Sequence, residues 1–179
     1  MTKDLKGDNS KKLSEKKREQ AREIIIDKCL YGIGFATHKE IDELNILNAT
    51  FLAMQRAYEK FLKASASIDF NLPCTHIIVD GNLLPHFLKD FNQTNLFDLD
   101  NALPKASTLI KGDDKIPAIM AASILAKTER DKIMRLADKK WPQYGFTSHK
   151  GYGTKYHTTA INKFSPCPIA RKTFSIGKN

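Results

Sequence analysis

Two acidic residues that follow short apolar runs are the strongest candidates for chemistry in this sequence. Asp80 follows residues 76–79 (HIIV), and Asp113 follows residues 106–110 (ASTLI) after a Lys-Gly pair. Such runs are typical of buried strands, whose first polar residue emerges at the strand tip. Carboxylates at neighbouring strand tips suit Mg²⁺ or Mn²⁺ in phosphodiester hydrolysis. We predict Asp80 and Asp113 as catalytic metal ligands, with a turn or cap role as the alternative for each; Asp114 is the weaker candidate, because adjacent carboxylates in one site would repel each other.

The placement of positive charge predicts a polyanionic partner. The chain has 29 Lys and Arg against 20 Asp and Glu, a net charge of +9. Residues 139–179 contain no Asp or Glu, and their eight basic residues are interleaved with seven aromatic ones. Cations that neutralise phosphates, with aromatic faces that lie against sugars or bases, are typical of a nucleic-acid-binding surface. A solvated basic face over core aromatics is the alternative.

Length and composition exclude several classes of protein. With 179 residues, 41% hydrophobic and 27% charged, the chain falls among ordinary globular domains and outside the disordered class. Its longest apolar run, residues 118–122, is far shorter than the roughly 20 residues of a membrane-spanning helix, and the charged N-terminus is unlike a signal peptide. The three cysteines and five histidines lack the spacing of a zinc site or a disulfide framework. We expect one domain over residues 1–179, in a cytoplasmic monomer that binds no membrane.

Helical and strand-like segments alternate along the chain and predict an α/β fold. A helix is expected from Ser14, as its N-cap, to about residue 29, and a short strand over residues 30–37 (LYGIGFAT). Apolar residues at steps of three and four over 44–61 predict the core-facing stripe of a long helix. Another helix is expected over residues 117–141, with small residues that allow close packing on a sheet.

Seven motifs resemble, in order and spacing, those of the ribonuclease HII family, the bacterial type 2 ribonucleases H. They are NSKKLS (9–14), EIDELNIL (40–47), VDGN (79–82), KGD (111–113), AASILAKTERD (121–131), YGFTSHKGYG (144–153) and RKTF (171–174). Each motif is weak by itself, but the whole series covers almost the entire chain. The resemblance implies a ribonuclease H-like mixed sheet flanked by helices, with a helical C-terminal region.

The resemblance also implies an activity and its site. It implies an endoribonuclease of DNA replication and repair that hydrolyses the RNA strand of RNA–DNA hybrids and incises duplex DNA at embedded ribonucleotides. Two Mg²⁺ or Mn²⁺ ions would serve the reaction, leaving 5′-phosphate and 3′-hydroxyl ends. Asp80 resembles the family's third metal ligand, and Asp113 the fourth or a residue that positions the others. Tyr152 resembles the residue that packs against the sugar at the RNA–DNA junction, and a core tyrosine is the alternative.

Further positions resemble residues that contact the nucleic-acid backbone or support the active site. They are Lys11, Lys12, Ser123, Lys127, His149, Lys150 and Arg171. For Ser123, which lies among alanines, helix packing is the alternative. We do not expect Asp42 and Glu43 to be catalytic, because in the family this stretch opens the long helix.

The sequence departs from the family pattern at its beginning. The family's Asp-Glu-x-Gly-Arg-Gly strand, with the first two metal ligands and the loop that reads the 2′-hydroxyl, has no counterpart in these residues. We therefore expect a sheet that lacks the family's N-terminal strands, and too few carboxylates for activity of this chain alone. Residues 86–100 are expected to form a surface insertion. A non-catalytic nucleic-acid-binding protein is the second hypothesis, and another two-metal nuclease or transferase of the same fold class is the third.

Overall fold

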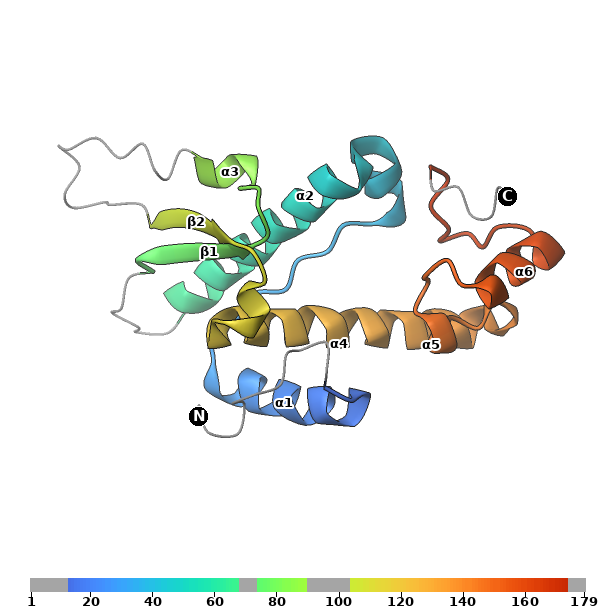
Figure 1. Cartoon of the computed structure of the whole chain (residues 1–179), viewed down its shortest axis with the longest axis horizontal. Helices are drawn as coiled ribbons and strands as arrows, with labels where there is room; N and C mark the ends of the chain where they lie inside the picture. Colours follow the sequence, from blue (N-terminus) through green and yellow to red (C-terminus); the bar gives the residue numbers. More distant parts are fainter. Residues whose placement is uncertain (1–12, 68–73, 90–103, 174–179) are drawn as a thin grey trace. The chain divides into compact units, whose positions relative to one another are not determined.

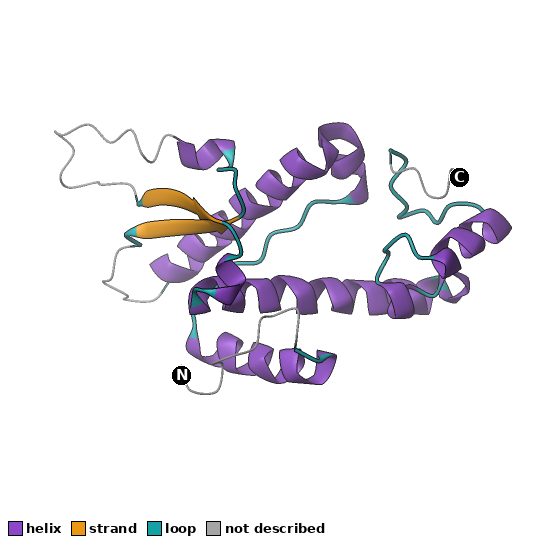
Figure 2. Cartoon of the chain, viewed as in Figure 1, coloured by secondary structure: helices purple, strands orange, loops and turns teal. Residues whose placement is uncertain are grey.

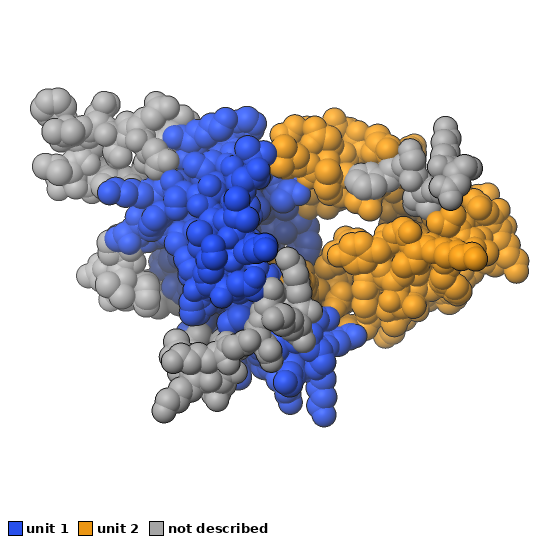
Figure 3. Space-filling view, in the orientation of Figure 1, with its two compact units in different colours: residues 1–35, 50–125 blue, residues 36–49, 126–179 orange. Residues whose placement is uncertain are grey.

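The computed structural model of the protein describes residues 13–67, 74–89 and 104–173 (Figures 1 and 2). The chain forms two compact units, and each combines segments that are distant in sequence (Figure 3). Unit 1 comprises residues 1–35 and 50–125, and unit 2 comprises residues 36–49 and 126–179.

In unit 1, helix α1 (Glu15–Lys28) packs against the first turns of α4 (Pro117–Lys140). The expected N-cap is confirmed, because the Ser14 side chain accepts a hydrogen bond from the backbone N–H of Lys17. The two helices bury a common apolar cluster. Its buried members are Ala21, Ile25, Met120, Ile124 and Leu125.

The sheet of unit 1 consists, over the described residues, of two parallel strands. β1 (His76–Asp80) pairs with β2 (Lys105–Leu109) so that Asp80 lies opposite Leu109. The β1 prediction is confirmed, and β2 begins one residue earlier than expected. Side chains of helix α2 (His38–Ala66) and of the short helix α3 (His86–Lys89) pack against the strands. The α/β class is confirmed, and the sheet that we expected to be mixed is parallel in this part of the chain.

Residues 30–37 do not form the expected strand; they run as an extended segment along helix α2 (His38–Ala66). Two residues of extended chain advance about 6.6 Å and four residues of helix about 6 Å, so alternate residues of the segment match successive helical turns. Gly32 accordingly lies against Ala57, and Gly34 against Ala53 and Ala57. Side-chain donors of α2 bind the carbonyl groups of the segment, with Lys60 Nζ 2.9 Å from Ile33 O. The hydrogen bonds and close contacts of the segment are thus made with a helix and not with a neighbouring strand.

Helix α2 is also not the continuous helix that its apolar period predicts. Asn45 leaves the helical conformation (φ 68°, ψ 168°), and its Oδ1 accepts hydrogen bonds from the N–H groups of Leu47 (3.0 Å) and Asn48 (3.1 Å). Asn45 is therefore the N-cap of a second helical segment. Leu44 and Leu47 are 40% and 45% exposed, so the beginning of the expected core stripe is wrong.

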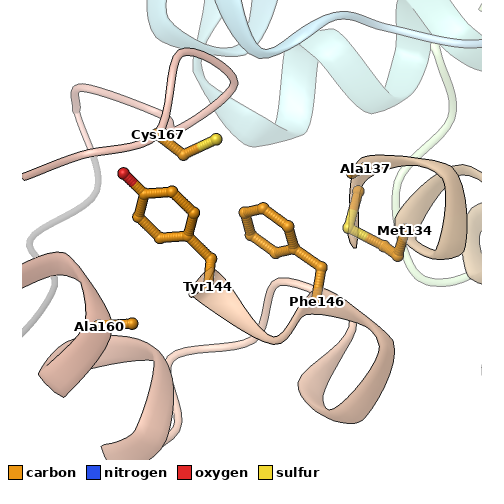
Figure 4. Packing of buried hydrophobic residues seen from close by; sticks show 6 residues of the cluster. All are labelled: Met134, Ala137, Tyr144, Phe146, Ala160 and Cys167. Carbon is orange, nitrogen blue, oxygen red and sulfur yellow. The ribbon is translucent and has the colours of Figure 1, made fainter. Parts of the chain in front are cut away.

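Unit 2 has a core of its own around the end of α4, α5 (Phe146–His149) and α6 (Lys155–Phe164) (Figure 4). The rings of Tyr144 and Phe146 stack with their centroids 5.6 Å apart. Tyr144 also donates its hydroxyl hydrogen to Ser165 O at 2.8 Å, which satisfies the buried phenol.

None of the helices in the part of the chain that the structure describes is long and apolar enough to cross a membrane.

Candidate active site and nucleic-acid interface

The tip of β1 and the turn that follows β2 bring the two candidate ligand segments together. Asp80 Oδ1 accepts a hydrogen bond of 2.8 Å from the backbone N–H of Gly112. Lys111 has a left-handed backbone conformation (φ 56°) and leads directly into the short helix η3 (Gly112–Asp114). Asp113 of this helix is only 3% exposed, whereas Asp80 and Asp114 are exposed. The juxtaposition predicted from the two strand ends is therefore present between residues 80 and 112–113.

Gly112 allows this close approach because it has no side chain. A Cβ atom at residue 112 would lie 2.5 Å from Ile119 Cδ1 and 3.5 Å from Asp80 Oδ1. Any larger residue would have to displace Ile119, which is buried at the start of α4. The Lys-Gly-Asp sequence thus combines a turn, a donor for Asp80 and a second carboxylate.

Asp80 and Asp113 supply two carboxylates from adjoining segments, which is fewer than a closed two-ion site needs. Mg²⁺ is commonly bound through one or two carboxylates and keeps several water ligands. The Gly112 N–H engages Oδ1 of Asp80, which leaves carboxylate lone pairs with which this exposed side chain could bind an ion. Within residues 13–67, 74–89 and 104–173, no group of three or more His, Cys, Asp or Glu side chains could hold a metal ion.

A tightly bonded loop in unit 2 carries Lys150 and Tyr152. The N–H of Lys150 donates to Phe146 O (2.8 Å), and Arg130 donates through Nη2 to Lys150 O (3.1 Å). Lys150 has a left-handed backbone conformation (φ 50°). Tyr152 is 68% exposed, so it is not the core tyrosine of the alternative interpretation. Its ring is available for stacking on a sugar or base.

His149 lies beneath this loop and not on its surface. The imidazole is 6% exposed, and Nε2 is 2.8 Å from Tyr144 O, a group that can only accept a hydrogen bond. Nε2 therefore carries the proton, and Nδ1 accepts the N–H of Gly151 at 3.2 Å. Both ring nitrogens are used by the backbone, so His149 supports the loop instead of presenting its ring to a ligand.

The other predicted positions are distributed over both units. Ser123 is a half-buried residue of α4 in unit 1, and Lys127 is half-buried on the part of α4 that belongs to unit 2. Lys11 and Lys12 lie outside the described residues. Arg171 is half-buried in unit 2; burial lowers its pKa, Arg130 lowers it further, and Asp42 acts in the opposite direction.

Asp42, which we expect to be structural and not catalytic, makes a long-range contact that the sequence does not indicate. Its Oδ2 accepts the N–H of Lys172 (2.9 Å), and its Oδ1 accepts both the N–H (2.9 Å) and the hydroxyl (2.7 Å) of Thr173. These bonds, with the Thr173 N–H first, lower the pKa of Asp42. Asp42 thereby holds the segment that follows Arg171. No spacing rule indicates a contact between positions so distant in the chain.

Each unit by itself has a feature typical of proteins that act on nucleic acids. Unit 1 has carboxylates at one edge of a parallel sheet, and unit 2 has basic residues beside an exposed aromatic side chain. Residues 2–176 match the sequence model of the Ribonuclease HII family. The chain therefore belongs to the ribonuclease HII family.

Three relatives show how much of the family's length the chain spans. It is 44% identical over 167 residues to the Ribonuclease HII of Clostridioides difficile, which covers 93% of this chain and 56% of that protein. It is 43% identical over 174 residues to that of Treponema denticola (94% of this chain, 81% of that protein). It is 46% identical over 175 residues to that of Shewanella sediminis (97% and 75%). The chain thus spans little more than half the length of the first of these relatives.

Proposed function

We propose that the protein is an endoribonuclease that hydrolyses the RNA strand of RNA–DNA hybrids and incises duplex DNA at embedded ribonucleotides. The products carry 5′-phosphate and 3′-hydroxyl ends. The observation that carries the proposal is the bond between Asp80 and the Gly112 N–H, which brings the β1 tip and the Asp113 turn together in a chain of this family. The relatives named Ribonuclease HII support the proposal.

In this proposal Asp80 and Asp113 hold Mg²⁺ or Mn²⁺. A bound ion of this kind lowers the pKa of a coordinated water and polarises a phosphoryl oxygen. Asp113 contributes its carboxylate from a site that is 3% exposed, where a nearby cation offsets the cost of burying a negative charge. Lys150 and Arg171 neutralise phosphates, and Tyr152 packs against a sugar of the duplex.

The metal ligands are tested by Asp80→Asn and Asp113→Asn, with Asp114→Asn as the matched control from the same turn. Mn²⁺ binding to the full chain, measured by calorimetry, should weaken about tenfold or more in the first two variants and stay unchanged in the control. The shortage of carboxylates leads us to expect no cleavage by this chain alone. If it does cleave a labelled RNA–DNA hybrid in Mg²⁺, the rates should follow the same order, and the product ends can be identified on a gel. Equal Mn²⁺ affinity in all three variants would contradict the assignment.

A non-catalytic nucleic-acid-binding protein is the second candidate function. The observation that favours it is that Asp80 and Asp113 are not joined by a third acidic, histidine or cysteine ligand among the described residues. It predicts hybrid binding that weakens with salt, ignores Mg²⁺ and is unaffected by Asp80→Asn. Mg²⁺-dependent cleavage that Asp80→Asn abolishes would exclude this alternative.

A further inference from the structure

His157 of α6 binds the main chain of Tyr152 through one ring nitrogen and leaves the other buried. Its imidazole is 5% exposed, and Nδ1 lies 3.0 Å from Tyr152 O. A carbonyl oxygen only accepts hydrogen bonds, so Nδ1 carries the proton and donates it. Nε2 is buried and has no hydrogen-bond partner among the described residues. The ring is therefore the neutral Nδ1–H tautomer, and this nitrogen donates its hydrogen bond to Tyr152 O.

His149 stacks on His157 and fixes its ring plane. The ring centroids are 4.4 Å apart with an angle of 17° between the planes, and Phe146 packs edge-on against His157 at 5.6 Å. His149 is held by the loop itself, through Tyr144 O and the N–H of Gly151. The two stacked rings thus bind the main chain on both sides of Lys150.

We propose that His157, braced by His149, is a positioning residue that orients Tyr152 for the RNA–DNA hybrid. The inference rests on the proposed function, in which the Tyr152 ring is a nucleic-acid contact. A ring that is 68% exposed has little packing of its own to fix it, so the backbone bond from α6 limits the conformations that must be lost on binding.

The surroundings of His157 favour the neutral ring that this role needs. Burial lowers the pKa of His157, the Tyr152 carbonyl acts in the opposite direction, and His149 of α5 and Arg171 of the C-terminal segment lower it further. Arg130 of α4 adds positive charge on the far side of the Lys150 carbonyl. Protonation at Nε2 would therefore place a buried donor without an acceptor near the Arg171 charge, which disfavours the charged ring.

Two variants separate the hydrogen bond from the packing of the ring. His157→Phe keeps an aromatic ring in the stack and removes both the donor and the buried lone pair. Thr154 N–H still bonds Tyr152 O at 2.8 Å, so this variant should fold and resist urea at least as well as the wild type. His157→Asn keeps an N–H donor the same number of bonds from the backbone as Nδ1.

The full chain and a fluorescein-labelled RNA–DNA hybrid provide the binding test. His157→Phe should weaken hybrid binding about three- to tenfold without loss of stability, and His157→Asn should restore most of the affinity. In a Tyr152→Ala background, His157→Phe should cause no further loss. An equal loss in that background, or no recovery by His157→Asn, would overturn the proposal.

Backbone ¹⁵N relaxation of the free protein tests, without nucleic acid, whether the hydrogen bond from His157 to Tyr152 O orders the loop. Residues 151–153 should become more mobile in His157→Phe and remain ordered in His157→Asn. If Tyr152→Ala binds the hybrid as well as the wild type, the contact assigned to Tyr152 in the proposed function fails, and the relaxation data still decide whether His157 orders the loop. Unchanged order in His157→Phe would overturn the positioning role by itself.

Discussion

The contact of residues 30–37 with α2 predicts that Gly34→Ala strongly destabilises the protein. An alanine Cβ at this position would overlap Ala53 O and lie 2.5 Å from Ala57 N, where ordinary contact begins at 3.4 Å. Both neighbours are backbone atoms of a helix, so the segment itself must move outward by about 0.9 Å or more. Such a gap forfeits a quarter to a half of the dispersion energy of the contact. It also stretches the bond from Arg56 Nη1 to Phe35 O, now 2.7 Å.

Overpacking and the weakened bonds together correspond to a loss of about 2–4 kcal/mol in the free energy of unfolding. Urea denaturation followed by circular dichroism measures this loss as a lower midpoint at an unchanged slope. Gly153→Ala is the control, because a Cβ there meets nothing within 4 Å and should leave the stability unchanged or slightly higher. If Gly34→Ala and Gly153→Ala unfold at the same urea concentration, the close packing of this segment on α2 is wrong.

Three further predictions concern unit 2. Asp42→Ala should release the segment at Thr173, and faster amide hydrogen exchange there would show it. Hydrogen bonding lowers the pKa of Asp42 below 3.8, so acidification of the wild type through that lowered pKa should have the same effect. Amide protection that persists in the variant would contradict the role of Asp42 in holding this segment. Lys150→Ala should weaken hybrid binding and reduce by about one the slope of the logarithm of the binding constant against the logarithm of the salt concentration. Lys89→Ala should change neither quantity. Equal slopes in the two variants would show that Lys150 does not contact the nucleic acid. The free energy of unfolding of the wild type should fall as pH drops below about 6.5 toward the lowered pKa of His157, because the unfolded chain takes up a proton that the folded one refuses. His157→Phe should abolish that part of the pH profile of stability, and a persistent profile would assign it to another group.

The features that the sequence predicts well are local ones. Ser14 caps α1 through a neighbour three residues away, and the apolar run before Asp80 forms β1. Thr37 and Glu40 carry another local signal, because they form a reciprocal capping box. The Thr37 N–H bonds Glu40 Oε2 at 2.7 Å, and the Glu40 N–H bonds Thr37 Oγ1 at 3.2 Å. Each of these features depends on residues within a few positions of one another.

The errors arise where tertiary contacts decide between equally acceptable local structures. Gly32 and Gly34 suit a strand, but they also allow the backbone to lie directly on a helix, and the helix prevails. The apolar period continues through Asn45, so it conceals the break that the Asn45 side chain caps. The stacking of His149 on His157 joins positions in two different helices, and the period of neither helix indicates it.

The hydrogen bonds of Asp42 have a consequence for the order in which the protein forms on the ribosome. The carboxylate and its Thr173 partner are 131 residues apart, and at the usual 5–20 residues per second synthesis of that interval takes roughly 7–26 s. Residues 36–49 are synthesised first and remain without the complete other part of unit 2, residues 126–179, throughout that time. During this interval Asp42 is a hydrated carboxylate on a nascent chain, open to the chaperones that meet it there. Unit 2 therefore cannot be completed before residue 173 has been synthesised, and the bonds of Asp42 to the segment after Arg171 form only then.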